Sequence, residues 1–371
     1  MRAVTDIESL TGTYVLLRAS LNVPVVDGTV TNRYRLEQAL PTLQYLYQAG
    51  AKTIVVAHIG RKPEETLKPT LEYLASKLPV TWGGAVGSPE LMAARNSMQN
   101  GDIILVENLR QHPGETTADP EFINKLTQLA DIYVNDAFAN AHREHASMVG
   151  VAKLLPAYAG LNVMREVTAL QAAMTPENPA LFMLGGAKFE TKLPLIEKYL
   201  KKYDHVFVGG ALLNDVMLAQ GYEIGQSMVS DISLKGMDFL TNPKCLQAVD
   251  VVVRQGETDS IVAVDAVPAD STIIDIGPAT VERLLPYIAD AKTILWNGPF
   301  GIYESGAKGS THAVAEAMAA ASGHSIVGGG DTVAAISELG LNQDFDFVST
   351  GGGAMLTYLE QGTTSALSLL E

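Results

Sequence analysis

The sequence predicts an α/β protein of two doubly wound domains, each with a mainly parallel sheet flanked by helices, joined by a hinge helix. Its 371 residues exceed what one hydrophobic core normally serves, so two domains of about 150–200 residues are expected. Short continuous apolar runs alternate with amphipathic segments of helical period, as parallel strands alternate with crossover helices. Hydrophobic residues make up 47% and charged residues 18%, which predicts a chain that folds throughout.

The predicted strands are apolar runs bounded by glycine, proline or polar turns. They cover residues 13–19, 52–58, 102–108, 131–137, 180–186, 205–211, 249–255, 272–278, 293–299, 325–331 and 345–353. Because these runs are continuous rather than alternating, parallel strands covered on both faces are expected. Residues 36–50, 192–203 and 310–323 have apolar positions at helical spacing, and they predict helices between the strands.

The boundary between the domains is expected near residues 155–175. There the segment PAYAGLNVMREVTALQAAMTPENP reads as a loop, one amphipathic helix and an exit punctuated by prolines. We therefore expect an N-terminal domain over 1–157, an interdomain helix over 158–175 and a C-terminal domain over 176–351.

Composition excludes several classes of function. The net charge of −15 argues against nucleic acid or an anionic membrane as the main partner. The N-terminus lacks an apolar signal region, and no run of about 18 apolar residues occurs, so a cytoplasmic protein is expected. Cys245 is the only cysteine, which excludes an intramolecular disulfide and a cysteine metal cage, and it is interpreted as a buried structural thiol.

Basic residues are distributed unevenly between the two halves. Residues 1–160 carry 14 Lys and Arg against 16 Asp and Glu, whereas residues 161–371 carry 12 against 25. Eight of the eleven arginines lie in the first part. Arginine is suited to forked recognition of carboxylate or phosphate, so the two halves are expected to bind different ligands.

In the first half, polar side chains follow the predicted strands, where open α/β sheets bind ligands. They are Arg18, Ser20 and Asn22, then His58, Gly60 and Arg61, then Glu107, Asn108 and Arg110, then Asn135 and Asp136, and then His142, Arg143 and His145, with Arg35 in the following helix. This basic cluster fits a small anion that carries both a carboxylate and a phosphate. The alternative is that each arginine pairs with a neighbouring acid such as Glu107 or Asp136.

In the second half of the chain, glycine residues follow the predicted strands. The pairs and triplets are Gly185-Gly186, Gly209-Gly210, Gly277-Pro278, Gly298-Pro299, Gly328 to Gly330 and Gly351 to Gly353. Such turns bring backbone N–H groups and helix N-termini close to phosphate, although each pair alone is also typical of a tight turn. None matches the P-loop or dinucleotide pattern, so a nicotinamide-dependent dehydrogenase lacks its fingerprint. A phosphate or nucleotide surface is predicted.

Lys188 and Lys192 lie four residues apart in GGAKFETK, so both can project from one face at the start of a helix. They are expected to face that phosphate surface, and the alternative is that they are solvent-exposed. Asp331 follows GGG and is expected to hold Mg²⁺ beside the phosphates, to cap a helix, or to do both. A nucleotide opposite a small anion predicts phosphoryl transfer by positioning and charge neutralisation.

These stretches resemble the phosphoglycerate kinase family along essentially the whole chain. The matching motifs are LNVP, ALPTL, HIGR, LKP, ENLR, YVNDAFANAHREHAS, LGGAK, WNGPFGIYE, GGGDT and STGGGA, in the family's order. The resemblance implies reversible phosphoryl transfer between 1,3-bisphosphoglycerate and MgADP, by a monomer whose domains close by hinge bending. It also implies that residues 352–371 return to the N-terminal domain.

Site residues follow from the resemblance motif by motif. Those implied to bind 3-phosphoglycerate are Ser20, Leu21, Asn22, Arg35, His58, Ile59, Gly60, Arg61, Arg110 and Arg143. Those implied to meet the nucleotide are Lys188, Lys192, Gly210, Gly277, Asn297, Pro299, Glu304, Gly329, Gly330, Asp331 and Thr332, with Asp331 on Mg²⁺. Arg35, Lys188, Lys192, Gly330 and Gly352 are implied to act on the transferring group.

The chain departs from the family's pattern at three places. Ser20 stands where the family has an aspartate, the loop after HIGR is shorter, and the C-terminus lacks the family's closing motif. These departures raise an alternative, a catalytically weakened relative that binds nucleotide without useful turnover.

Overall fold

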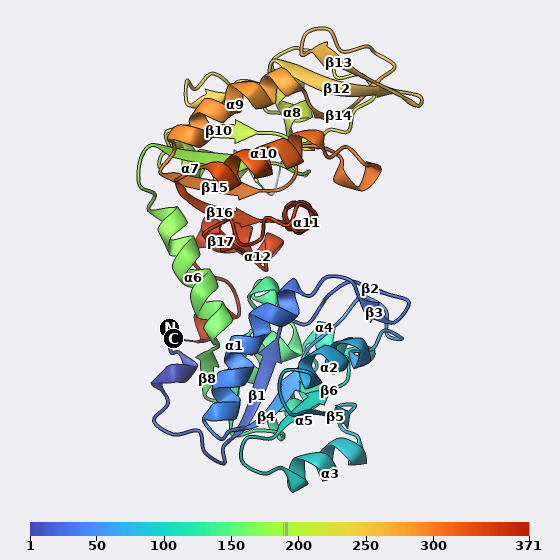
Figure 1. The fold of residues 1–371 in the computed structure, drawn as a ribbon, viewed down its shortest axis with the longest axis vertical. Coiled ribbons are helices and arrows are strands. Elements are labelled where there is room, and N and C mark those ends of the chain that lie inside the picture. Colours follow the sequence, from blue (N-terminus) through green and yellow to red (C-terminus); the bar gives the residue numbers. More distant parts are fainter. Residues whose placement is uncertain (188, 190–191, 371) are drawn as a thin grey trace. The chain divides into compact units, whose positions relative to one another are not determined.

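The computed structural model describes residues 1–187, 189 and 192–370. The chain divides into two compact units, one formed by residues 1–168 together with the segment from Thr363 onward, and the other by residues 169–362. Each unit is built around its own six-stranded parallel sheet (Figure 1). The predicted fold class is confirmed.

The sheet of unit 1 has the strand order β5-β6-β4-β1-β7-β8. Its strands are β1 (Tyr14–Ala19), β4 (Lys52–Val56), β5 (Val80–Gly84), β6 (Ile103–Val106), β7 (Ile132–Asp136) and β8 (Ala157–Ala159). All of its pairings are parallel, and the register places Ala19 beside Asp136. Because the chain leaves β1 toward β4 and later returns to β7 on the other side, the polar residues after β1 lie at the reversal of strand order.

Helices and short turns surround this sheet. They are α1 (Tyr34–Gln48), α2 (Lys68–Ala75), α3 (Pro89–Ser97), α4 (Gly114–Thr117) and α5 (Pro120–Thr127), with single turns η1 (Val4–Asp6), η2 (Leu109–Gln111), η3 (Phe138–Asn140), η4 (Ala146–Gly150) and η5 (Val151–Lys153) and a hairpin of β2 (Val25–Val26) and β3 (Thr29–Val30). Helix α1 lies along β1 and β4 (Figure 1). There Leu36 and Leu43 of the helix join Leu17 and Val55 of the strands in one core.

Helix α6 (Leu161–Met174) carries the division between the units, which falls between Thr168 and Ala169. Its first turn is held by side chains of unit 1. Asp136 accepts hydrogen bonds through Oδ1 from the backbone N–H groups of Asn162 (2.9 Å) and Val163 (3.3 Å). A carboxylate distant in sequence thus satisfies N–H groups at the helix N-terminus, which have no partner within the helix.

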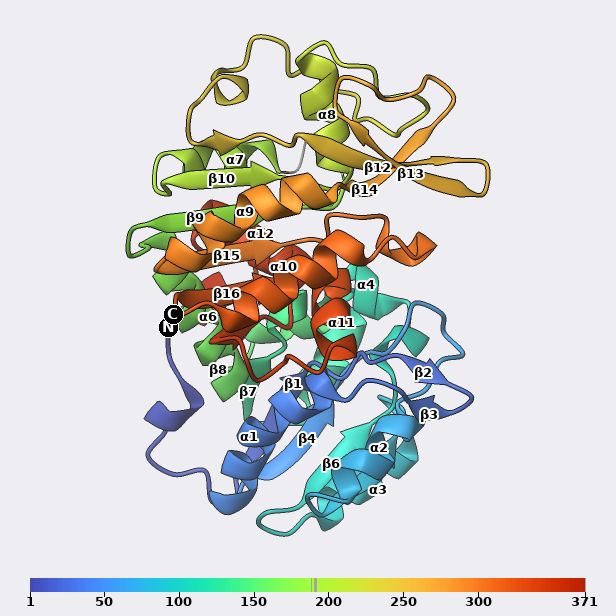
Figure 2. The ribbon, with the colours of Figure 1, turned by 45° about the horizontal axis from the view of Figure 1, so that its top comes forward.

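The sheet of unit 2 has the order β11-β10-β9-β15-β16-β17. Its strands are β9 (Ala180–Leu184), β10 (His205–Val208), β11 (Cys245–Leu246), β15 (Thr293–Asn297), β16 (His324–Gly328) and β17 (Phe347–Val348). Its helices are α7 (Leu193–Leu200), α8 (Ala211–Ala219), α9 (Pro278–Asp290), α10 (Gly309–Ala320), α11 (Gly330–Glu338) and α12 (Gly352–Gln361), with single turns η7 (Asp238–Leu240), η8 (Tyr303–Ser305) and η9 (Leu367–Leu369), the last in unit 1. Helices α9 and α10 pack side by side on one face, and α7 and α12 pack together on the other (Figure 2).

Two predicted parallel strands belong instead to a separate antiparallel sheet, β13-β12-β14. Its strands are β12 (Asp250–Gln255), β13 (Thr258–Ala263) and β14 (Thr272–Ile276). Gly256, with φ of +59°, turns β12 directly back into β13, because Gln255 pairs with Thr258. A two-residue connection joins only antiparallel strands, which is why this pair cannot be parallel.

The end of the chain is divided between the two units, with α12 in unit 2 and the segment from Thr363 onward in unit 1. Helix α12 belongs to unit 2, because Lys198 of α7 donates from Nζ to the carbonyls of Leu359 (2.7 Å) and Glu360 (2.6 Å). After α12, the backbone N–H of Ala366 donates to the carbonyl of Ala141 (3.0 Å), which ties the end of the chain to unit 1. None of the described helices is long and apolar enough to cross a membrane.

Candidate active site

In unit 1, the basic side chains after β1, β4 and β6 are linked through the backbone around Asn22. The side-chain oxygen of Asn22 accepts from the N–H of Gly60 (2.9 Å), and the backbone carbonyl of Asn22 accepts from Nη1 of Arg35 (2.7 Å). Arg110 donates from Nη1 to the carbonyl of Gly60. Gly60 has φ of +62°, a left-handed conformation that favours glycine. These contacts bring four of the predicted substrate ligands to one place.

Glu107 and Asp136, the two acids expected as possible partners of these arginines, bind other groups. Glu107 accepts from the hydroxyl of Thr66 (2.7 Å) and from the N–H of Leu67 (3.0 Å). Asp136 accepts from the start of α6, as described above. The alternative that Glu107 or Asp136 pairs with the arginines is therefore wrong.

The cations of the cluster repel one another. Burial, followed by Arg143 and Arg18, lowers the pKa of Arg110, and burial followed by Arg61 lowers the pKa of Arg143. Burial and the nearby arginines also lower the pKa of His58 well below its usual value, and they lower that of His145 to about 4. The histidines are neutral at pH 7, and a bound anion would relieve the repulsion among the arginines.

Three other predicted substrate residues differ in what they offer. The side chains of Leu21 and Ile59 lie in the hydrophobic core, so only their backbone atoms are available, and the N–H of Ile59 already donates to Asn108 (3.2 Å). Ser20 is 3% exposed, and its Oγ has no hydrogen-bond partner among the described residues. A buried hydroxyl without a partner is available to bond to a ligand.

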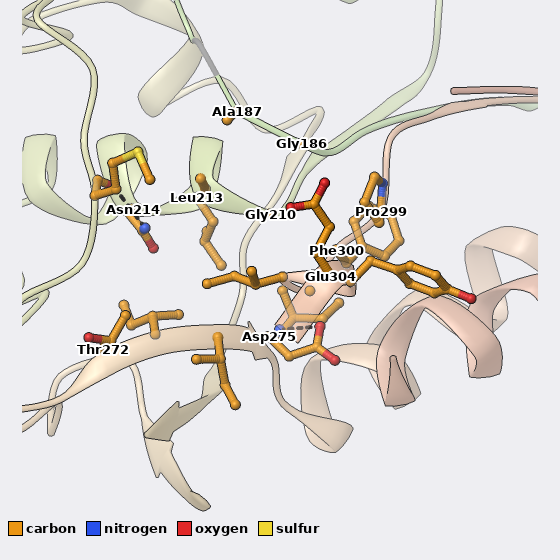
Figure 3. Close-up of a pocket in the computed structure, with 18 of the residues that line it drawn as sticks. Gly186, Ala187, Gly210, Leu213, Asn214, Thr272, Asp275, Pro299, Phe300 and Glu304 are labelled. Atoms are coloured by element: carbon orange, nitrogen blue, oxygen red, sulfur yellow. Dashed lines mark hydrogen bonds between the residues drawn. The ribbon is translucent and has the colours of Figure 1, made fainter. Parts of the chain in front are cut away.

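In unit 2, a cavity of about 370 Å³ opens at the carboxyl ends of the strands. Four of the predicted nucleotide residues line it: Gly210, Pro299, Glu304 and Asp331. Figure 3 shows Leu213 and Asn214 of α8 on one side and Pro299, Phe300 and Glu304 on the other. The cavity walls are thus mainly apolar, and they also include glycine backbone and the carboxylates of Asp275, Glu304 and Asp331.

The glycine turns beside the cavity pack backbone against backbone. A Cβ on Gly298, whose φ is +94°, would lie 2.5 Å from the carbonyl oxygen of Gly185. A Cβ on Gly210 would lie 2.5 Å from the backbone nitrogen of Gly186. The glycines are therefore required by close approach, and the same absence of side chains exposes backbone N–H groups to a ligand.

Lys192 lies against these turns and is 8% exposed. Its Nζ donates to the carbonyls of Gly185 (2.9 Å) and Ala187 (2.8 Å), and burial lowers its pKa to about 8. Among the described residues, no carboxylate pairs with this buried cation. The predicted companion, Lys188, lies outside the described residues.

Two helix N-termini converge nearby. A Cβ on Gly352, at the start of α12, would lie 3.3 Å from Cα of Gly329 and 3.6 Å from the nitrogen of Gly330, at the start of α11. Gly329 is the N-cap of α11, so Asp331 is the second helical residue and the expected capping role is wrong. Two adjacent N-termini place several free N–H groups and two positive dipole ends together, which favours an anion.

Comparison with known proteins identifies the family. A family model described as phosphoglycerate kinase matches residues 4–362. The chain belongs to the phosphoglycerate kinase family. It is 40% identical to the phosphoglycerate kinase of Dictyoglomus turgidum over 385 residues, which cover 98% of this chain and 97% of that one. It is 38% identical to that of Methylorubrum extorquens over 382 residues, with 97% and 96% covered.

Solved phosphoglycerate kinases have the same fold. The structure from Pyrococcus horikoshii has a TM-score of 0.84 at 28% identity, with 100% of this chain and 98% of that one covered. The structure from Coxiella burnetii has a TM-score of 0.80 at 34% identity, with 99% and 98% covered. The chain is thus a phosphotransferase of glycolysis, and the alternative of a weakened nucleotide-binding relative is not favoured.

The remaining nucleotide residues predicted from the phosphoglycerate kinase motifs lie around the cavity without lining it. Asn297 ends β15 and donates to the sulfur of Met355 (3.3 Å), and Thr332 is buried in α11. Gly277 precedes α9, whose N-terminal N–H groups already donate to Asp250. Because that helix start is satisfied by a protein carboxylate, it is the least suited of the predicted positions to hold a phosphate.

Several cavity residues were missed by the sequence reasoning. They are Ala187, Ala211, Leu213, Asn214, Gln226, Met228, Thr272, Asp275, Phe300, Ile302 and Tyr303. Most are apolar, and an apolar residue that lines a cavity has the same sequence signal as one that fills a core. Asp275 was the exception that could have been found, because it interrupts the apolar strand TIIDI.

Glu304 and Asp331 face the same cavity, and burial together with the charge of Glu304 raises the pKa of Asp331. Among the described residues, no three His, Cys, Asp or Glu side chains are arranged to hold a metal ion by themselves. This fits Mg²⁺, which is usually bound by one or two carboxylates together with the phosphates of its substrate.

Proposed function

We propose that unit 1 of this phosphoglycerate kinase binds the 3-phosphoglycerate moiety and unit 2 binds the Mg²⁺ nucleotide. One observation carries the proposal: basic side chains from four strand ends crowd together in unit 1 and lower one another's pKa, while Glu107 and Asp136 bond elsewhere. Such a cluster is stable only if an anion of matching charge is its normal partner.

In unit 1, arginine guanidinium groups would hold the carboxylate and phosphate ends of 3-phosphoglycerate. Asn22, His58 and the backbone at Gly60 would fix its orientation, and the hydroxyl of Ser20 would bond to it. Arg35, anchored on the carbonyl of Asn22 (2.7 Å), would extend toward the transferring group. These side chains act by charge and position, since the carboxylate nucleophile is already anionic and needs no general base.

In unit 2, the nucleotide would occupy the cavity, with its base against the apolar walls and its ribose near Glu304. The N-termini at Gly330 and Gly352 would donate N–H groups to the phosphates, and Lys192 would neutralise charge that develops during transfer. Asp331 would hold Mg²⁺, which when bound neutralises phosphate charge. The Lys192 ammonium would then exchange its carbonyl partners for phosphate oxygens.

Transfer requires the acceptor carboxylate to come within about 3–3.5 Å of the phosphorus, with water excluded. We propose that helix α6, which carries the division between the units, is the segment that bends to allow it. We also propose that the enzyme is a cytoplasmic monomer, as the family resemblance implies. Light scattering during gel filtration measures the mass in solution, and a dimer would refute the second point.

The decisive experiment is a coupled assay of the purified protein with 3-phosphoglycerate, ATP and Mg²⁺, followed by NADH oxidation. We expect turnover that depends on all three and is lost in Lys192→Ala. The site assignment is tested by calorimetry with each ligand alone. Arg143→Ala should weaken 3-phosphoglycerate binding and leave MgADP binding unchanged, and the reverse result would refute the assignment of ligands to units.

A further inference from the structure

A buried polar network lies behind the substrate cluster of unit 1, and the transfer mechanism does not use it. Arg18 at the end of β1 donates from Nε to the hydroxyl of Ser147 (2.9 Å) and from Nη1 to the carbonyl of Ala19 (2.5 Å). Its Nη2 lies 2.9 Å from Nδ1 of His58. Arg18 therefore connects the interior of the unit to a histidine of the proposed substrate site.

The charge of Arg18 is balanced from its other side. Ser147 donates from its hydroxyl to Oε1 of Glu115 (2.6 Å) and from its backbone N–H to Oε2 (3.0 Å). Arg18, Ser147 and Glu115 are all 0% exposed. Glu115 thus supplies the negative charge, and the Ser147 hydroxyl bridges it to the guanidinium. A fully buried pair of this kind is costly to build, so it indicates a role besides stability.

The contact with His58 determines which ring nitrogen carries the proton. A guanidinium group only donates hydrogen bonds, so Nδ1 of His58 must accept and be unprotonated. The proton of the neutral ring then lies on Nε2, for which no partner is found among the described residues. The other groups that act electrostatically on the ring are Arg110, Arg143 and His145, and together with burial they lower its pKa well below the usual value.

We propose that Arg18, held by Ser147 and Glu115, is a positioning residue that keeps His58 as the neutral Nε2–H tautomer. The ring then presents a hydrogen-bond donor to the substrate anion at every pH at which the enzyme works. The opposite tautomer would direct a lone pair at a carboxylate or phosphate and repel it. The role of the donor rests on the proposed function, which places 3-phosphoglycerate against His58.

The tautomer is measured directly by long-range ¹H–¹⁵N NMR of the histidine rings in the unaltered protein without substrate. The His58 signals are assigned by their absence in His58→Gln. We expect Nδ1 to have the shift of an unprotonated nitrogen and Nε2 that of a protonated one, unchanged between pH 5.5 and 8.5. A protonated Nδ1, or a ring that titrates within this range, would overturn the proposal.

The positioning role is tested with the double variant Arg18→Met/Glu115→Gln, which leaves no unbalanced buried charge. In it, the His58 ring should sample both tautomers, while burial, Arg110, Arg143 and His145 still keep it neutral. The KM for 3-phosphoglycerate should then be severalfold higher than in the unaltered enzyme at both pH 6 and pH 8.5, because the ring no longer holds its donor toward the substrate. The KM for ATP should stay constant.

Two further variants keep the test decisive. Arg95→Met removes an arginine of unit 1 that bonds to the carbonyl of Leu129 instead, and its pH profile should match that of the unaltered enzyme. Should the double variant not fold, Ser147→Ala retains both charges and removes only the bridge, and it should show the same change of tautomer to a smaller extent. A folded variant of either kind with the unaltered tautomer and an unaltered KM for 3-phosphoglycerate would overturn the proposal. Loss of turnover in the unaltered protein would instead refute the proposed function, because the tautomer is read without substrate.

Discussion

Asp136 offers a quantitative test of how unit 1 holds the start of α6. Its carboxyl is 1% exposed, and burial raises its pKa from 3.8 to about 7. The folded state therefore keeps the proton to a higher pH than the unfolded chain does. The stability that this group contributes is present below pH 3.8 and is lost as the pH rises toward 7.

The size of the effect follows from that pKa. At about 1.4 kcal/mol for each pH unit between 3.8 and about 7, ionising the buried carboxyl costs the folded state about 4 kcal/mol. Asp136→Asn removes this cost and keeps an oxygen that accepts from the N–H groups of Asn162 and Val163. The new amide N–H groups lack a partner in the folded state, and this reduces the gain in stability by about 2 kcal/mol. At pH 8.5 the variant should therefore be more stable by about 2 kcal/mol, and the gain should vanish by pH 5.

The measurement is urea unfolding followed by fluorescence, because the two tryptophans lie one in each unit. In a Trp296→Phe background, Trp82 of β5 reports unit 1 alone. Asp119→Asn is the matched control, since Asp119 caps α5 at a partly exposed position where the two residues are equivalent caps. If Asp136→Asn is less stable than the unaltered protein at pH 8.5, attraction between the carboxylate and the N-terminus of α6 outweighs burial, and the reasoning fails.

Four further predictions concern the two sites. Lys192→Met should lower kcat by about 100-fold to 1000-fold without changing the dissociation constant for 3-phosphoglycerate. In the unaltered enzyme, burial lowers the pKa of Lys192 to about 8, so MgADP affinity measured by calorimetry should fall as the pH rises above 8. Gly298→Ala should destabilise unit 2 by more than about 2 kcal/mol in urea unfolding. The control Gly306→Ala, also at positive φ but with no atom within 4 Å of the new Cβ, should cost about 1 kcal/mol. Equal losses of stability would refute the close-approach argument. Asp331→Asn should raise the Mg²⁺ concentration for half-maximal activity at least tenfold in the coupled assay while ADP still binds without metal, and an unchanged Mg²⁺ titration would remove Asp331 from the metal site. Ser20→Asp should change the KM for 3-phosphoglycerate at least threefold, since Ser20 Oγ is buried and has no described partner; an unchanged KM would show that the departure from the family is neutral.

The class of fold was predictable because parallel strands covered on both faces leave a continuous apolar run, and unit 1 and most of unit 2 follow that rule. The rule failed at β12 and β14, which are also short and apolar although they pair antiparallel. A run of four to six apolar residues indicates that a strand is buried, but it does not indicate whether the strand pairs in parallel or antiparallel. Here only the tight turn at Gly256 distinguishes the two kinds of pairing. The two-residue loop between 255 and 258 was the signal that could have corrected the prediction.

The candidate site was predictable to the extent that its chemistry is carried by polar residues close in sequence to a strand end. Arg35, Asn22, Gly60 and Arg110 were recognised in this way, and the structure links them. The walls of the nucleotide cavity were not recognised, because Leu213 and Phe300 look like core residues until the fold shows what they face. The Arg18 network was missed for a different reason. Ser147 lies 129 residues from Arg18, and a buried pair of that separation leaves no local pattern.

The uneven charge of the two halves has a physical explanation in how each unit would neutralise its ligand. A free 3-phosphoglycerate brings no counterion, so unit 1 would have to supply the positive charge itself, and its arginines would do so. A nucleotide arrives with Mg²⁺, which cancels much of the phosphate charge before any protein group acts. Unit 2 can therefore use backbone N–H groups at glycine turns, keep a single buried lysine, and place the carboxylates of Glu304 and Asp331 at the same cavity. An arginine cluster there would compete with the metal, which would explain why the proposed nucleotide unit is the more acidic half of the chain.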